Sequence, residues 1–136
     1  MRFTSHIGTI ARAAWPGLVV FVAHAVLGER FSHEPIVDPI AHFSGGCAVA
    51  FAMLILMRDA RPWFGQLTRL THALVAIGVG SLIALAWELG ELTSDLIGGT
   101  HIQSDAHNTL RDLALGVTGA CVVTLWRVRR LRRTVW

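Results

Sequence analysis

Four long apolar segments restrict the folds that this sequence can adopt. They run over residues 13–27, 40–57, 70–87 and 113–126. A helix needs about 20 residues to cross a bilayer, or about 17 at the short end, so the middle two segments suffice alone and the outer two need their flanks. Trp15, Trp87 and Trp126 lie near segment ends, where the membrane interface favours tryptophan. The segments predict an all-α, polytopic membrane helix bundle.

Composition also favours lipid as the solvent. Hydrophobic residues make up 53% of the chain and charged residues 15%, whereas a soluble domain carries about 25% charged residues. A chain of 136 residues is too small to bury this apolar surplus internally. We expect one transmembrane domain over residues 1–136, with helices at about 10–28, 38–58, 68–92 and 108–128.

The first segment is open to a second interpretation. Arg2 and Arg12 precede it, and residues 23–25 have the small-x-small form of a signal-peptide cleavage site. A cleaved signal peptide would leave three transmembrane helices, and a retained helix would leave four.

The basic residues predict an orientation. All twelve are arginines, and ten of them fall at the N-terminus, in the loop at 58–69 or in the basic tail at 127–136. Only Arg30 and Arg111 fall on the other side. By the positive-inside rule, we expect both termini to be cytoplasmic. The sequence has no nucleic-acid-binding module, so the bilayer, and not nucleic acid, is the expected partner of these charges.

Small residues interrupt the apolar segments. In lipid, glycines let helices approach closely, so these positions predict tight helix packing. They are Gly45, Gly46, Gly78, Gly80, Gly116 and Gly119.

Acidic residues gather on the side opposite to the arginines. Only Asp59 among the nine acids falls on the cytoplasmic side. Asp38 and His42 share a helix face at the start of the second segment, and Glu88 and Glu91 share one at the end of the third. The fourth segment opens with Asn108 to Asp112, and His24 could join from the first. Ionisable groups at membrane depth usually mark a functional site.

Three uses of this polar cluster stay open at the level of sequence. The carboxylates and imidazole could bind a divalent cation. They could share protons, as a relay or as a general acid and base. They could also pair with arginines and backbone amides to lock the bundle. Soluble-enzyme motifs such as G-x-S-x-G, the P-loop and H-E-x-x-H are absent, so any catalysis would be membrane-embedded.

Three motifs carry a family resemblance. They are DPIAHFSGG at 38–46, AWELGE at 86–91 and QSDAHNTLRDL at 103–113. In this order they resemble the YjdF-like family of bacterial inner-membrane proteins, to which no activity is assigned, and more distantly VanZ-like proteins. The resemblance covers about residues 36–122 and departs at Asn108, where relatives carry a second acid. It implies a shared site made by Asp38, His42, Glu88, Glu91, Gln103, Asp105, Thr109 and Asp112.

These observations lead to a specific expectation for the site. The expected ligands of a divalent metal ion are Asp38, His42, Glu88, Glu91, Asp105 and Asp112. Glu88 and Asp112 are the candidate catalytic groups, and Gln103, Asn108, Thr109 and Arg111 complete the polar site.

Two classes of function follow from this site. A bound cation could activate water against a lipid or lipid-linked substrate. The alternative is a non-enzymatic module that binds an ion or lipid headgroup, or that serves as a structural subunit, with the cluster as a metal-free hydrogen-bond and salt-bridge network. A homo-oligomer or a larger membrane complex is compatible with either class.

Overall fold

The computed structural model describes residues 3–30, 36–65, 67–103 and 105–130. The elements are α1 (Phe3–Arg30), α2 (Val37–Asp59), the short α3 (Arg61–Phe64), α4 (Arg69–Gly98) and α5 (Ala106–Arg130). Within these residues there is no strand, and the four long helices are each long and apolar enough to cross a membrane. The predicted all-α bundle is therefore confirmed.

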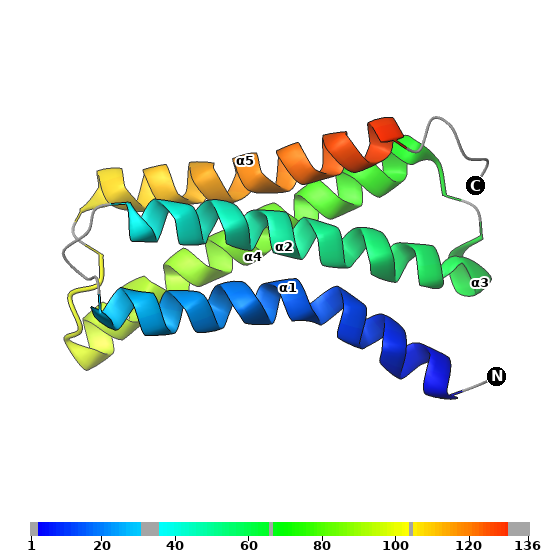
Figure 1. The fold of residues 1–136 in the computed structure, drawn as a ribbon. Helices are drawn as coiled ribbons and strands as arrows, with labels where there is room; N and C mark the ends of the chain where they lie inside the picture. Colours follow the sequence, from blue (N-terminus) through cyan, green and yellow to red (C-terminus); the bar gives the residue numbers. More distant parts are fainter. Residues whose placement is uncertain (1–2, 31–35, 66, 104, 131–136) are drawn as a thin grey trace.

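The long helices run side by side, and α2 lies in the middle of them (Figure 1). It packs against α1, α4 and α5, and α4 also packs against α5. The starts of α2 and α5 lie at one end of the bundle, together with the ends of α1 and α4 (Figure 1). We call this the polar end, because the acidic cluster described below lies there. The opposite end, next to α3, is the arginine end.

The described arginines divide between these two ends as expected. Arg111 and Arg30 belong to elements at the polar end. The other arginines of the described ranges are Arg12, Arg58, Arg61, Arg69, Arg127, Arg129 and Arg130. Except for Arg12, which lies within the first half of α1, they belong to the arginine end. Arg2, Arg132 and Arg133 lie outside the described residues. The cytoplasmic placement of the termini stays a prediction from this asymmetry.

Many large apolar side chains are exposed and several polar side chains are buried, which is the reverse of a soluble protein. Thr124 and Asp112 are among the fully buried side chains, whereas Leu82 is 65% exposed and Leu110 is 66% exposed. Lipid tails solvate such leucines as well as a protein core does, so helix association must come from packing and polar contacts.

Glycines provide that packing between α2 and α5. A methyl group at Gly46 would overlap the carbonyl oxygen of Gly116, and one at Gly119 would overlap the carbonyl oxygen of Phe43. A methyl group at Gly80 on α4 would lie 2.7 Å from the Cβ atom of Ala120. We call these contacts the glycine seam. The predicted packing role is confirmed here, but Gly45 and Gly78 have open space around them.

The ends of α4 are set by a hydroxyl cap at its start and by a glycine after its last residue, and its C-terminal end lies beyond the expected limit. The Thr68 hydroxyl caps the start of α4 by accepting from the N–H of Thr71 at 3.1 Å. At the other end, α4 continues to Gly98, past the expected limit near residue 92, and stops at Gly99, which takes the left-handed conformation that favours glycine (φ 64°). Pro16 lies inside α1, and Figure 1 shows a bend in the N-terminal half of that helix.

Candidate metal centre

His42 lies between two carboxylates at the polar end. Its Nε2 atom is 3.2 Å from Oδ1 of Asp38, one turn earlier on α2. Its Nδ1 atom is 3.2 Å from Oε1 of Glu88 on α4. The side chains of His42 and Glu88 are 6% and 3% exposed. A neutral imidazole has one N–H and one lone pair, so it can donate to only one of the two carboxylates.

Glu88 has an unsatisfied oxygen. Its Oε1 atom is buried and accepts no hydrogen bond from the described residues; Nδ1 of His42, 3.2 Å away, forms an ion pair with it only when the imidazole is protonated. Its Oε2 atom is 3.4 Å from the side-chain amide of Gln103, which donates to the Glu88 backbone carbonyl at 2.9 Å. A buried carboxylate oxygen without a partner is costly, and a bound cation would satisfy it.

Glu91 lies one turn further along α4. Its Oε1 atom accepts from the indole N–H of Trp87 at 2.7 Å. Glu91, Glu88 and His42 each offer a ligand atom, and these three atoms lie within 4.8 Å of one another. A metal bonded at about 2.0–2.3 Å keeps its ligand atoms roughly 3 to 4.5 Å apart, so a small contraction would suffice.

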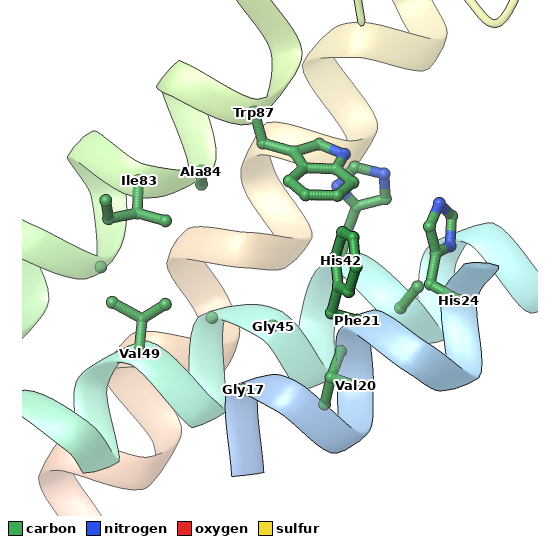
Figure 2. Close-up of a pocket in the computed structure, with 13 residues that line it drawn as sticks. Gly17, Val20, Phe21, His24, His42, Gly45, Val49, Ile83, Ala84 and Trp87 are labelled. Carbon is green, nitrogen blue, oxygen red and sulfur yellow. The ribbon is translucent and has the colours of Figure 1, made fainter. Parts of the chain in front are cut away.

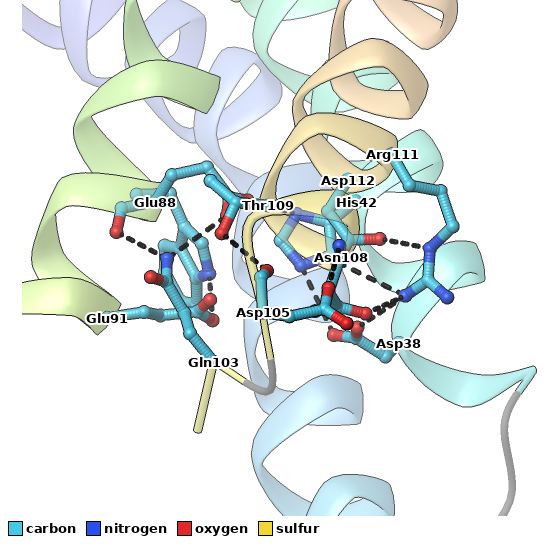
Figure 3. Close-up of polar contacts among 11 residues, drawn as sticks. Asp38, His42, Glu88, Glu91, Gln103, Asp105, Asn108, Thr109, Arg111 and Asp112 are labelled. Atoms are coloured by element: carbon cyan, nitrogen blue, oxygen red, sulfur yellow. Dashed lines mark hydrogen bonds and ion pairs between the residues drawn. The ribbon is translucent and has the colours of Figure 1, made fainter. Parts of the chain in front are cut away.

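Arg111 ties α5 to α2 next to this group. Its Nε and Nη2 atoms donate to the two oxygens of Asp112 at 2.9 and 3.2 Å. Its Nη2 atom also lies 3.2 Å from Oδ2 of Asp38 and 2.6 Å from Oδ1 of Asn108. Figure 3 shows these three acceptors converging on one guanidinium. Asp38, His42 and Asp112 form a second group with ligand atoms within 4.8 Å, but both of its acids already bind the arginine.

The connection between α4 and α5 folds back over the cluster. The Asp95 carboxylate accepts from the backbone N–H groups of Ile102 and Gln103 at 2.7 and 2.8 Å, and from the Thr100 hydroxyl at 2.5 Å. This brings Gln103 to Glu88. The expected site did not include Asp95, although its position seven residues after Glu88 places it on the same helix stripe.

Asp105 and Thr109 lie at the start of α5. The Asp105 carboxylate accepts from the backbone N–H of Asn108 at 2.8 Å, which is a helix-capping contact. The Thr109 hydroxyl is 3.4 Å from the Asp105 carbonyl. Asp105 is exposed and belongs to neither group of closely spaced ligand atoms. The structure thus brings together all the expected metal ligands except Asp105.

Aromatic rings border the cluster on the side of α1. The His24 ring centroid lies 6.4 Å from that of His42 and 5.9 Å from that of Trp87. The Phe21 and Trp87 rings meet edge to face at 6.2 Å. His24 therefore does join the polar end.

Fold and site together define a multi-pass helical membrane protein with a buried histidine and carboxylate cluster at one end of the bundle. A family model described as "Predicted membrane protein (DUF2238)" matches residues 9–133, so the chain belongs to this family. No curated protein and no solved structure matches the chain significantly.

Proposed function

We propose that His42, Glu88 and Glu91 bind a divalent cation, and that this cation acts on a lipid or lipid-linked substrate at the polar end. The observation that carries the proposal is the Oε1 atom of Glu88, which is buried, lacks a hydrogen bond from the described residues and lies 3.2 Å from Nδ1 of His42. A cation between these groups would satisfy both.

The surroundings of His42 support this assignment. A metal-bound histidine usually donates its second N–H to a carboxylate, which fixes the ring orientation. Asp38 occupies that position at 3.2 Å from Nε2, and in the tautomer that donates from Nε2 to Asp38 the lone pair of Nδ1 faces Glu88. Arg111 in turn holds Asp38 through its other oxygen.

The second group of acids is a weaker candidate. Arg111 contributes a positive charge within hydrogen-bond distance of both Asp38 and Asp112, and a cation there would have to displace it. We therefore assign Asp38 and Asp112 to positioning. Of the two candidate catalytic residues, Glu88 keeps a place at the reacting centre. The expected role of Asp105 as a ligand stays a prediction.

One nitrogen and two carboxylate donors suit Zn²⁺, Mn²⁺ or Fe²⁺. Three protein ligands leave open positions for a water and for a substrate oxygen. A cation in this setting activates water for hydrolysis or polarises a phosphoryl or carbonyl oxygen. The neighbourhood of apolar helices makes a lipid or lipid-linked molecule the natural substrate class.

The non-enzymatic alternative rests on Arg111. This one side chain contacts Asp38, Asn108 and Asp112, and so links α2 with α5. A cluster whose only role is to lock the bundle would need these contacts and no cation.

We further propose that the arginine end faces the cytoplasm of a bacterial inner membrane, because arginine-rich segments are retained on that side. The three sequence motifs support kinship with YjdF-like and, more distantly, VanZ-like proteins. Assembly into an oligomer or a larger complex is compatible with the many exposed apolar side chains.

The test is the metal content of the purified chain. We expect close to one divalent metal per chain in wild type, measured by elemental analysis in mild detergent without chelator, and a loss of most of it in Glu88→Gln. Asp105→Asn is the matched control, because asparagine can still cap α5, and it should keep the metal. Wild-type protein without metal after metal-supplemented growth would refute the proposal. Loss of metal in Asp105→Asn would instead restore the larger ligand set.

A further inference from the structure

An apolar crevice reaches His42, one of the three proposed ligands of the cation. It lies between α1 and α4, and α2 forms its floor (Figure 2). In the described part of the chain, the backbone of α1 lies close to that of α2 alone, and only side chains such as Phe21 and His24 reach Trp87 on α4. Gly17 and Val20 of α1, Gly45 and Val49 of α2, and Ile83 of α4 line the crevice.

The size of the crevice suits hydrocarbon. Its volume is about 180 Å³, and an apolar cavity of about 150 Å³ is large enough to bind benzene. From His42 to Val49 along α2 it extends over roughly 10 Å, at about 1.5 Å per helical residue. This length accommodates a substantial part of one acyl chain.

One end of the crevice is polar. Figure 2 shows the rings of Phe21, His24, His42 and Trp87 gathered there. Nδ1 of His24 is buried and has no hydrogen-bond partner among the described residues. Behind His42 lie Glu88 and the proposed cation. An apolar slot that ends at an imidazole and a cation matches a molecule with a hydrocarbon chain and an anionic head.

We infer that the crevice between α1 and α4 binds one acyl chain of a phospholipid, with the lipid phosphate held at His24 and at the cation on His42. This inference rests on the proposed function, because the cation supplies most of the positive charge that would hold the phosphate. It makes a membrane phospholipid the substrate or ligand of the site.

Glycine substitutions can fill the crevice without changing the cluster. A Cβ atom at Gly45 meets nothing within 4 Å, so a side chain can begin there without a backbone clash, and the leucine of Gly45→Leu would occupy space that a lipid chain would take. Gly78→Leu is the matched control, because Gly78 is exposed on α4, also has open space and is not among the lining residues.

The experiment is native mass spectrometry of the full chain in mild detergent. Palmitoyl-oleoyl phosphatidylglycerol is added in one sample and the diacylglycerol with the same chains in another, with metal content measured on the same protein. We expect wild type and Gly78→Leu to retain one phosphatidylglycerol. Gly45→Leu should retain it about tenfold less well, because leucine overfills the slot, and should keep its metal. His24→Ala should weaken the preference for phosphatidylglycerol over diacylglycerol, because one of the two phosphate contacts is removed.

Each contrary outcome has its own meaning. Equal retention by Gly45→Leu and Gly78→Leu would overturn the crevice as the chain site. Equal retention of the two lipids by wild type would overturn the phosphate contact. An intact mass that lacks α1 would overturn the inference, because α1 forms one wall. Metal without bound lipid in wild type would refute this inference alone, whereas bound lipid without metal would refute the proposed function and leave the chain site standing.

Discussion

Two adjacent glycines on α2 have opposite surroundings at the position of the missing Cβ atom. Gly46 lies in the glycine seam, where α2 and α5 touch backbone to backbone and no methyl group fits. Gly45 also borders the crevice between α1 and α4, as Gly46 does, but nothing lies within 4 Å of its missing Cβ atom. The same residue type therefore brings two helices together at one position and preserves an empty slot at the next. In a membrane bundle, the facing surface decides what a glycine does.

Breaking the seam should have the largest effect. Gly46→Ala places a methyl group on the Gly116 carbonyl oxygen, which belongs to the backbone and not to a flexible side chain. We expect a loss of about 3 kcal/mol of unfolding free energy, or roughly 10 °C in detergent melting temperature. The measurement is the thermal unfolding of Gly46→Ala, with Gly78→Ala as the control. An unchanged melting temperature would mean that α2 and α5 are less close than described.

Breaking the polar contact at the end of the seam should have a smaller effect. Arg111→Ala leaves the carboxylate of Asp112, which is 1% exposed, without its partner. Removing one member of a buried ion pair costs 3–5 kcal/mol, but Arg111 is 39% exposed, so we expect about 1–2 kcal/mol. Asp112→Asn removes the charge itself and should cost less. Urea or thermal unfolding of both variants would compare them, and a greater loss in Asp112→Asn would contradict this account of the pair.

The smallest effect on stability should come from the crevice. Gly45→Ala adds a methyl group to open space and replaces a poor helix former with a good one. We expect a melting temperature equal to or slightly above that of wild type. A loss as large as that of Gly46→Ala would show that the crevice wall is packed, which would remove the contrast between the two regions.

The sequence was sufficient to predict the four long helices, because each has a continuous apolar run bounded by arginines, glycines or acids. It also placed Asp38, His42, Glu88 and Asp112 together, because consecutive antiparallel helices bring their ends to one side of the membrane. It could not distinguish Gly45 from Gly46, since that difference depends on which side of α2 meets the backbone of α5. The short α3 and the extension of α4 to Gly98 depend on local turn chemistry that apolar periodicity does not report.

The connection between α4 and α5 was the least predictable part of the site. Asp95 accepts from two backbone N–H groups and one hydroxyl and so directs Gln103 back to Glu88. Such a contact depends on a specific backbone path, which sequence spacing does not determine. Asp105, whose role as a ligand stays a prediction, caps α5 with its carboxylate in the structure, a common role for aspartate at a helix start.

The central claim is that His42, Glu88 and Glu91 hold a cation, and thermal unfolding with and without metal tests it most directly. The metal found in the purified protein is removed by chelator and then restored at about 100 times its dissociation constant. A cation bound only to the folded state should stabilise wild type by about 2.7 kcal/mol, or roughly 10 °C, and should leave Glu88→Gln unchanged. The claim would be contradicted if the wild-type melting temperature were the same with and without metal while Glu88→Gln lost much stability. That result would support a structural network.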